Sequence, residues 1–217
     1  DEENKDEQPT EEPSDGIDTQ ESENTNEVDT VVPWDGTTAK KFAGGDGSKD
    51  NPYQISNGAE LAYLAQQVNS EKIDSEAFIT LTNNIDLNNK AWTPIGNSDS
   101  VFAGTFDGNG HTISGMYINI TGSYSSAIKG RLYQGLFGCV EAGTVQNLIV
   151  TGSVTIGNEK SVNVSYIGGI VGKNDGGKVQ NCGFYGTVSA KQNVSNPPKD
   201  CTKDNGGVVG KGKAAKC

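Results

Sequence analysis

A six-residue pattern occurs three times in this chain at nearly constant spacing. Apolar residues stand at positions one, four and six, and small or polar residues stand at positions two and three. The copies begin 32 and 34 residues apart, at Ile113, Val145 and Val179. Self-similarity at such a period indicates a solenoid or another array of stacked units. The surface of a stack, rather than a closed globular pocket, is then the first place to look for function.

The repeat unit has the pattern of β-strands. A helix would need apolar residues at spacings of three and four over ten or more residues, and the units lack this spacing. Leu148 and Val150 alternate with exposed positions, as in a strand, and Gln146 and Asn147 interrupt the alternation. We therefore expect each unit to consist of a strand, a two-residue corner and a second strand.

Stacking of these units predicts which residues become neighbours. Equivalent positions of adjacent strands lie about 4.8 Å apart. We expect Val145 to lie between Ile113 and Val179. At the corner we expect Asn147 to lie beside Asn181 and to form a short amide ladder with it.

A second motif precedes the corners of the second and third copies and occurs once more after them. An apolar pair flanked by glycines occurs at Gly135–Gly138, Gly169–Gly172 and Gly207–Gly210, with spacings of 34 and 38 residues. Glycine tolerates the positive φ angles of tight bends. With short strands near 152–154 and 186–188, each repeat supplies about three strands. An all-β parallel β-helix is the simplest fold that stacks them.

The acidic charge of the chain is concentrated in a tail. Residues 1–30 hold 13 Asp and Glu residues and a single Lys, whereas the remaining residues are nearly balanced in charge. The tail contains almost no apolar residues, so burial cannot offset its chain entropy. We expect a disordered acidic linker over 1–33, extended by self-repulsion, and a folded domain over 34–217.

The ends of the domain have different expected structures. Asn57 and Glu60 have the spacing of a capping box, and apolar residues follow at helical spacing, which predicts a short capping helix at about 58–69. Repeats follow over about 102–217. The chain begins with Asp1 and ends at Cys217 just after a third glycine motif. We therefore expect a fragment with a truncated last repeat, continued by the same chain after Cys217.

These motifs resemble a known family. The three glycine motifs resemble the GLUG motif, and Val179–Cys182 resembles the repeat of that family. The preceding segments Pro52–Ile55, Trp92–Gly96 and Asp107–Ile113 are similar to the region that precedes GLUG repeats in bacterial surface proteins. The resemblance covers roughly 34–217. It implies a secreted or wall-anchored bacterial protein with a right-handed β-helix, of a kind discussed as adhesins, and it supplies no catalytic residues.

Few residues suggest chemistry. His111, the only histidine, follows Gly-Asn-Gly, which favours a corner over a catalytic site. Asp86 and Asp107 are the acids that could face one groove as a glycan-cleaving pair. The segment Gly45–Asn51 offers oxygen ligands for Ca²⁺, but it also fits a surface turn. We expect no metal and no cofactor.

The cysteines do not form an obvious disulfide framework. Cys182 stands at the inward position of Leu148 and is expected to behave as a small buried hydrophobe. Cys139 aligns with Lys173 and is expected to be more exposed. The connectivity of any disulfide does not follow from the sequence.

Two polar insertions are the expected ligand-binding loops. They follow Val154 and Val188 at equivalent places, over 156–165 and 191–205, so stacking would set them side by side. They could equally be solvent-exposed spacers. The candidate contact residues are Asn158, Glu159, Lys160, Asn163, Asn193, Lys199 and Asp200.

We therefore expect a non-enzymatic display or adhesion module, extracellular or on the bacterial cell surface or wall, that binds a host or matrix glycan or protein. The alternative is an accessory or catalytic domain of a secreted glycan- or protein-degrading enzyme. The balanced charge of the folded part gives no reason to expect nucleic acid. No run of 18 apolar residues occurs, so we expect no membrane span in this fragment.

Overall fold

A computed structural model describes residues 31–120, 132–156 and 165–190. The chain divides into two units, Asp1–Thr30 and Val31–Cys217, and the fold below belongs to the second. The predicted linker lies outside the described residues except for its last three positions. The third glycine motif, Gly207–Gly210, also lies outside them.

Strands predominate in the described part of the chain, which contains a single helix, α1 (Gly58–Asn69). The strand-rich class predicted from the sequence is confirmed. The strands are β1 (Tyr53–Ile55), β2 (Phe78–Leu81), β3 (Ile85–Asp86), β4 (Thr105–Asp107), β5 (Thr112–Ile120), β6 (Leu132–Gln134), β7 (Phe137–Glu141), β8 (Thr144–Ile156), β9 (Ser165–Ile167), β10 (Val171–Asp175) and β11 (Lys178–Ala190).

Helix α1 begins where its cap residues predict. Asn57 is extended, and its side-chain oxygen accepts the backbone N–H of Glu60 at 3.0 Å. The Glu60 carboxylate reaches back to accept the N–H of Ser56 at 2.7 Å. The inward face, led by Leu61 and Leu64, is buried in the core that the strands share. The helix expected at 58–69 is thus confirmed.

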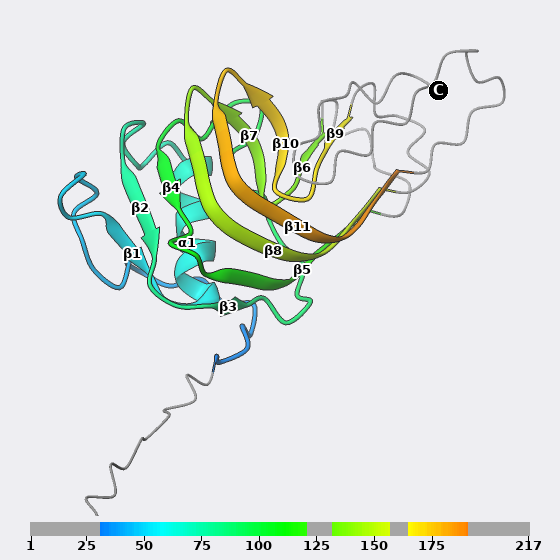
Figure 1. The fold of residues 1–217 in the computed structure, drawn as a ribbon, viewed down its shortest axis with the longest axis horizontal. Coiled ribbons are helices and arrows are strands. Elements are labelled where there is room, and N and C mark those ends of the chain that lie inside the picture. The colour runs from blue at the N-terminus through cyan, green and yellow to red at the C-terminus, as the bar shows by residue number, and fades with distance from the viewer. Residues whose placement is uncertain (1–30, 121–131, 157–164, 191–217) are drawn as a thin grey trace, which may run out of the picture. The chain divides into compact units, whose positions relative to one another are not determined.

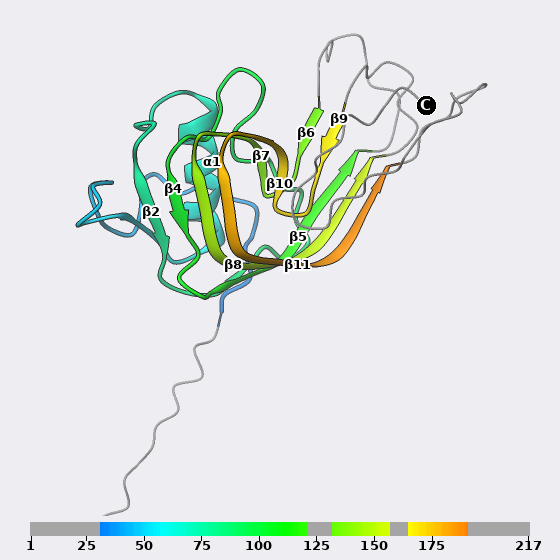
Figure 2. The ribbon, with the colours of Figure 1, turned by 45° about the horizontal axis from the view of Figure 1, so that its top comes forward.

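All pairs between named strands are parallel. One sheet has the order β1-β2-β4-β8-β5-β3, with β11 also paired to β8, and β7–β10 and β6–β9 form two small sheets. Figure 1 shows β8 and β11 as two long bent ribbons that run side by side, and Figure 2 shows β5 next to them. We call residues 102–120 layer 1, residues 132–156 layer 2 and residues 165–190 layer 3.

Layers 2 and 3 stack in a constant register along their long strands. Val145 pairs with Val179, and Phe137 pairs with Val171, in each case 34 residues apart in sequence. Asn147 and Asn181, at the predicted corner, both adopt left-handed φ angles, 54° and 51°. Asn is among the few residues that tolerate this conformation, so the sequence fixes the corner locally.

The predicted neighbour of Val145 in layer 1 is wrong. Val145 pairs with Phe106 of β4, whereas Ile113 pairs with Val150. The corner of layer 1 spans residues 108–111 and is longer than the corner at Asn147. A bulge between Ile113 and Met116 then shifts the register again.

The core is built from inward side chains that stack across layers. Leu148 and Val150 of layer 2 are fully buried, as predicted, and Val179 and Phe184 of layer 3 are half-buried against the same core. Two columns run through the paired strands: Ile79, Phe106, Val145 and Val179, and Ile85, Ile113, Val150 and Phe184.

The predicted exposure of Cys139 is also wrong. Its pairing with Lys173 is as expected, but Cys139 is only 3% exposed. All of Phe137–Val140 is buried, so both faces of β7 are covered. Cys182 pairs with Leu148 as expected and is half-buried. Burial raises the pKa of both thiols, and both are free.

Candidate functional site

The predicted ligand loops are untested. All seven candidate contact residues lie outside the described residues: Asn158, Glu159, Lys160, Asn163, Asn193, Lys199 and Asp200. The site is therefore sought in the described part of the chain.

The residues considered for catalysis or for Ca²⁺ binding serve turns. The backbone N–H of His111 donates to Gly108 O at 2.8 Å, which closes the expected corner. Asp86 accepts the N–H of Asn88 at 2.7 Å. In Gly45–Asn51, Asp46 accepts the N–H of Ser48 at 2.9 Å, as in a surface turn. Within residues 31–120, 132–156 and 165–190, no group of three or more His, Cys, Asp or Glu is placed to hold a metal ion.

Asp107 ends a ladder of stacked amides. Asn181 Nδ2 donates to Asn147 Oδ1 at 3.1 Å, and Asn147 Nδ2 donates to Asp107 Oδ1 at 3.0 Å. Beside this chain, Gln180 Nε2 donates to Gln146 Oε1 at 2.8 Å, and Gln146 Nε2 donates to Asp107 Oδ2 at 2.7 Å. We call these five residues the Asp107 ladder. The predicted Asn147–Asn181 pair is confirmed, and both amide chains run to one carboxylate.

The ladder keeps Asp107 ionised. Burial alone would raise the pKa of its carboxyl, but hydrogen bonds from Asn147, Gln146 and the Asn109 N–H outweigh burial and lower it. A carboxylate that accepts three hydrogen bonds is a poor proton acceptor. Asp107 and Asp86 also have different strand partners. Asp107, just before the 108–111 corner, pairs with Gln146 of β8, whereas Asp86 pairs with Ser114, which follows that corner in β5.

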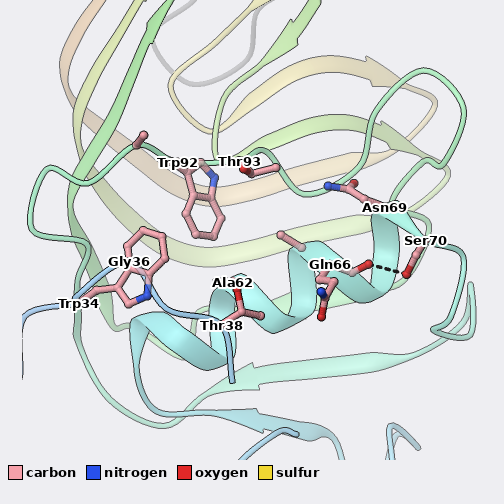
Figure 3. Close-up of a pocket in the computed structure, with 11 residues that line it drawn as sticks. Trp34, Gly36, Thr38, Ala62, Gln66, Asn69, Ser70, Trp92 and Thr93 are labelled. Carbon is pink, nitrogen blue, oxygen red and sulfur yellow. Dashed lines mark hydrogen bonds between the residues drawn. The ribbon is translucent and has the colours of Figure 1, made fainter. Parts of the chain in front are cut away.

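A cavity of about 450 Å³ opens beside α1. We call it the Trp pocket. Three segments far apart in sequence form it: the chain before β1, helix α1, and the segment that follows β3 (Figure 3). Its lining residues are Trp34, Gly36, Thr38, Ala62, Ala65, Gln66, Asn69, Ser70, Ala91, Trp92 and Thr93.

The walls of the Trp pocket are fixed by internal hydrogen bonds. The rings of Trp34 and Trp92 meet edge to face, with centroids 5.9 Å apart. Their indole N–H groups donate to Thr37 O at 2.7 Å and to Leu136 O at 3.1 Å. Asn69 donates to Pro94 O at 3.0 Å and accepts from the Gly96 N–H at 2.8 Å. These side chains therefore hold the pocket in one shape.

The open groups of the Trp pocket are polar and uncharged. Thr38, Gln66, Ser70 and Thr93 are exposed, and the Ser70 hydroxyl donates to the Gln66 carbonyl at 2.6 Å (Figure 3). No lining residue carries a charge. The pocket offers hydroxyls and an amide beside indole and methyl groups, a combination that suits a neutral polar ligand.

A second hollow, of about 250 Å³, has the opposite character. Three carboxylates, Glu71, Asp74 and Asp99, line it together with apolar residues. Ser100 donates to Glu71 Oε1 at 3.2 Å. The acids are exposed, so water solvates them without a ligand.

Sequence reasoning missed the Trp pocket. Trp92 was considered only as part of the Trp92–Gly96 segment of the family resemblance, and residue 34 only as the first position of the folded domain. The one available signal was that the chain has only two tryptophans. Nothing in a periodic pattern brings residues 34, 66 and 92 together.

Comparison with known proteins gives partial matches. No family model matches this chain. It is 35% identical over 141 residues to the "Putative Gly-rich membrane protein" of Evansella cellulosilytica, covering 62% of this chain and 15% of that protein. It is 30% identical over 187 residues to "Halomucin" of Haloquadratum walsbyi, covering 82% of this chain and 2% of that protein. The chain thus spans a small part of both relatives.

A crystal structure of a "putative immunoglobulin A1 protease" from Bacteroides ovatus is also similar. The TM-score is 0.38 at 17% identity, over 71% of this chain and 66% of that one. Among the described residues, the single helix is too short and too polar to cross a membrane.

Proposed function

We propose that residues 34–217 form a non-enzymatic display and adhesion module of a GLUG-type bacterial surface protein, folded as a right-handed parallel β-helix. The observation that carries this proposal is the constant 34-residue register between layers 2 and 3, in both the β7–β10 and β8–β11 pairs. A stack in a fixed register grows by about 4.8 Å with each added layer, and this makes it a stiff spacer.

The first end of the stack has a cover of its own. Leu61, Leu64 and Val68 of α1 are buried in the core shared with the strands of layers 1 and 2. Terminal repeats of stacked proteins need such a cap, because their last apolar face would otherwise meet water. This supports the assignment of α1 as the capping helix.

The described residues favour adhesion over catalysis. Asp107 is engaged in its ladder, Asp86 in a turn, and His111 in a corner. A glycan-cleaving pair needs two carboxyls that face each other across the scissile bond, one of them protonated. The lowered pKa of Asp107 opposes the protonated role.

The outer face of the bent sheet suits a contact surface. Lys178 is the only charged residue in β5, β8 and β11. Tyr117, Ser153 and Thr187 form one paired row on this side, and Asn119, Thr155 and Ser189 form another. Hydroxyl, amide and phenol groups bind uncharged glycans or protein surfaces without a desolvated charge. The names of the relatives, a membrane protein and a halomucin, support a place at the cell surface.

An array of glycans and matrix proteins tests this function. The chain is expected to bind a subset of the array and to release no reducing sugar and no peptide from it. The structure places Ile156 in β8, buried in the core, and Ser165 in β9, so the replaced segments are cut back to 157–164 and 191–205. A variant in which these two segments become short Gly/Ser turns should keep its thermal melting. Loss of binding in that variant would place the contact on the loops. Turnover of any array member would favour the alternative, a domain of a degradative enzyme.

A further inference from the structure

We propose that the Trp pocket binds a neutral saccharide, through Gln66 and Thr93 as polar contacts. This inference deepens the adhesion function and rests on it, because it names the ligand class and a binding site. The site lies on the N-terminal side of the stack, away from the predicted loops in sequence.

The first argument is shape. The cavity of about 450 Å³ falls within the range of roughly 300–1,000 Å³ that is typical of small-molecule sites. Segments 34–38, 62–70 and 91–93 surround it, so a ligand would be enclosed from three sides. Internal hydrogen bonds of Trp34, Trp92 and Asn69 hold the walls before any ligand arrives. A preformed site loses little conformational entropy on binding.

The second argument is the supply of free hydrogen-bonding groups. Within the described residues, no partner is found for the Gln66 side-chain amide or for the hydroxyls of Thr38 and Thr93. The amide supplies two donors and one acceptor oxygen, and each hydroxyl supplies a donor and an acceptor. Sugar hydroxyls both donate and accept, so they match this mixed set, whereas a purely accepting or donating ion does not.

The third argument is charge. No residue that lines the pocket is charged. Asp35, next to the lining in sequence, already accepts the Thr37 N–H at 2.8 Å and its hydroxyl at 2.6 Å. A charged ligand would lose water of solvation without gaining a counter-charge. The pocket therefore favours a neutral ligand over an acidic or basic one.

The fourth argument is the apolar wall. Trp34 and Trp92 line the pocket but are only 8% and 6% exposed, so a ligand would meet a small part of each indole. Ala62, Ala65 and Ala91 add methyl groups to the lining. The C–H faces of a pyranose ring pack on such a surface while its hydroxyls point to the polar groups.

Tryptophan fluorescence provides a specific test, because the two tryptophans of the chain both line this pocket. The full chain is titrated with glucose, galactose, mannose, N-acetylglucosamine and their disaccharides, and in parallel with glucuronate and glucosamine. We expect a saturable change in emission with at least one neutral sugar and a response at least tenfold weaker to its charged counterpart. Absence of a saturable change with every neutral sugar, or equal affinity for charged sugars, would overturn the proposal.

Substitutions locate the response. Gln66→Ala and Thr93→Ala are expected to weaken the affinity for that sugar about tenfold each, because each removes hydrogen bonds to it. Gln67→Ala is the matched control, since it truncates the same side chain on the same helix outside the lining. Ala62→Leu, which fills the cavity, should abolish the response while circular dichroism stays unchanged. An unaltered affinity in Gln66→Ala and Thr93→Ala would refute the site.

The outcome is separable from that of the array. If the chain binds array members while its tryptophan emission is indifferent to neutral sugars, the Trp pocket fails and the adhesion function stands. If the emission responds to a neutral sugar while the chain binds no member of the array, the pocket is a site for a small ligand and the adhesion function fails.

Discussion

Layers 2 and 3 place like residues on like residues, whereas layers 1 and 2 meet through a corner of different length and a bulge. We call the contact between layers 2 and 3 the first seam and the contact between layers 1 and 2 the second seam. Across the first seam Gln180 lies on Gln146, and Tyr166 stacks on Tyr133 with ring centroids 5.2 Å apart and nearly parallel. Across the second seam the register slips by a bulge between Ile113 and Met116. Both seams are made of parallel strand pairs, but at the corner amide meets amide across the first seam and carboxylate meets amide across the second.

The difference explains why every side-chain hydrogen bond of the Asp107 ladder points the same way along the stack. Amides that stack on amides have no preferred end, because each group both donates and accepts. In layer 1 the carboxylate of Asp107 replaces the amide, and it only accepts. Gln146 and Asn147 must therefore both donate toward it, and Gln180 and Asn181 follow. The irregular layer orients the regular ones.

The two seams also differ in burial. Leu148 of layer 2 lies between its strand partner Cys182 in layer 3 and the corner at Gly108 in layer 1, and it is 1% exposed. Cys182, its counterpart in layer 3, pairs with layer 2 alone among the described strands and is half-buried. We therefore expect substitutions in layer 2 to cost more than equivalent substitutions in layer 3.

The largest effect is expected for Leu148→Asp. An unpaired carboxylate in the core, together with the lost leucine side chain, costs on the order of 5 kcal/mol and should unfold the module. Cys182→Asp should destabilise it less, because the half-buried site lets water reach the carboxylate. Thermal melting followed by circular dichroism measures both.

Ile149→Asp is the matched control for this series. Ile149 follows Leu148 directly but points outward and is 39% exposed. A melting temperature close to that of the parent is expected. Equal losses in Leu148→Asp and Ile149→Asp would contradict the inward register of β8.

Gly152→Ala should have the next largest effect, at the seam between layers 1 and 2. Gly152 has φ of 151°, and a Cβ atom there would lie 2.0 Å from Met116 O. Backbone must move to relieve this clash, at a cost of about 3 kcal/mol. Gly110→Ala isolates the conformational part, because Gly110 has φ of 79° and open space around it; it should cost ~1 kcal/mol. Urea unfolding of the two variants compares them, and a larger loss for Gly110→Ala would argue against close packing at Gly152.

The repeats could be predicted from the sequence because their signal is local. The corner residues Asn147 and Asn181 recur at the spacing of the layers, and so do the apolar positions around them. Helix α1 was predictable because its cap and its apolar spacing lie within a dozen residues. Strand pairing between layers 2 and 3 then follows from the period alone.

The remaining features depend on contacts that no period encodes. Ile113 was predicted to pair with Val145 because both begin a copy of the six-residue pattern. The longer corner at 108–111 shifts the register, so Ile113 pairs with Val150 instead. Cys139 was predicted to be exposed because it aligns with Lys173. Its burial depends instead on the segments that cover both faces of β7, and these are distant in sequence. The Trp pocket joins three segments that share no motif. In each case the outcome depends on tertiary packing, which neither the period of the repeat nor the composition of the chain predicts.

Removal of single ladder amides should give a smaller, graded effect. Asn147→Gly and Asn181→Gly keep the left-handed corner available, so each variant mainly loses the side-chain amide. Asn147 makes two ladder hydrogen bonds and Asn181 makes one among the described residues. We expect losses of about 2 and about 1 kcal/mol in urea unfolding. The reverse order would show that the ladder is not anchored at Asp107.

The smallest expected effect is a pH dependence that Asp107 supplies. Its pKa is lowered below the ordinary value of 3.8, because the hydrogen bonds of the ladder outweigh burial. The native state therefore favours the ionised form, and this contribution to stability is present above about pH 4 and is lost as the pH falls through the native pKa. Asp107→Asn is expected to be less stable at neutral pH and to lose less stability than the parent between about pH 5 and pH 2. Urea unfolding of parent and variant across this window measures the difference between the two slopes. Parallel slopes would mean that Asp107 has the same pKa in the folded and unfolded chain, and that the amides orient the ladder without it.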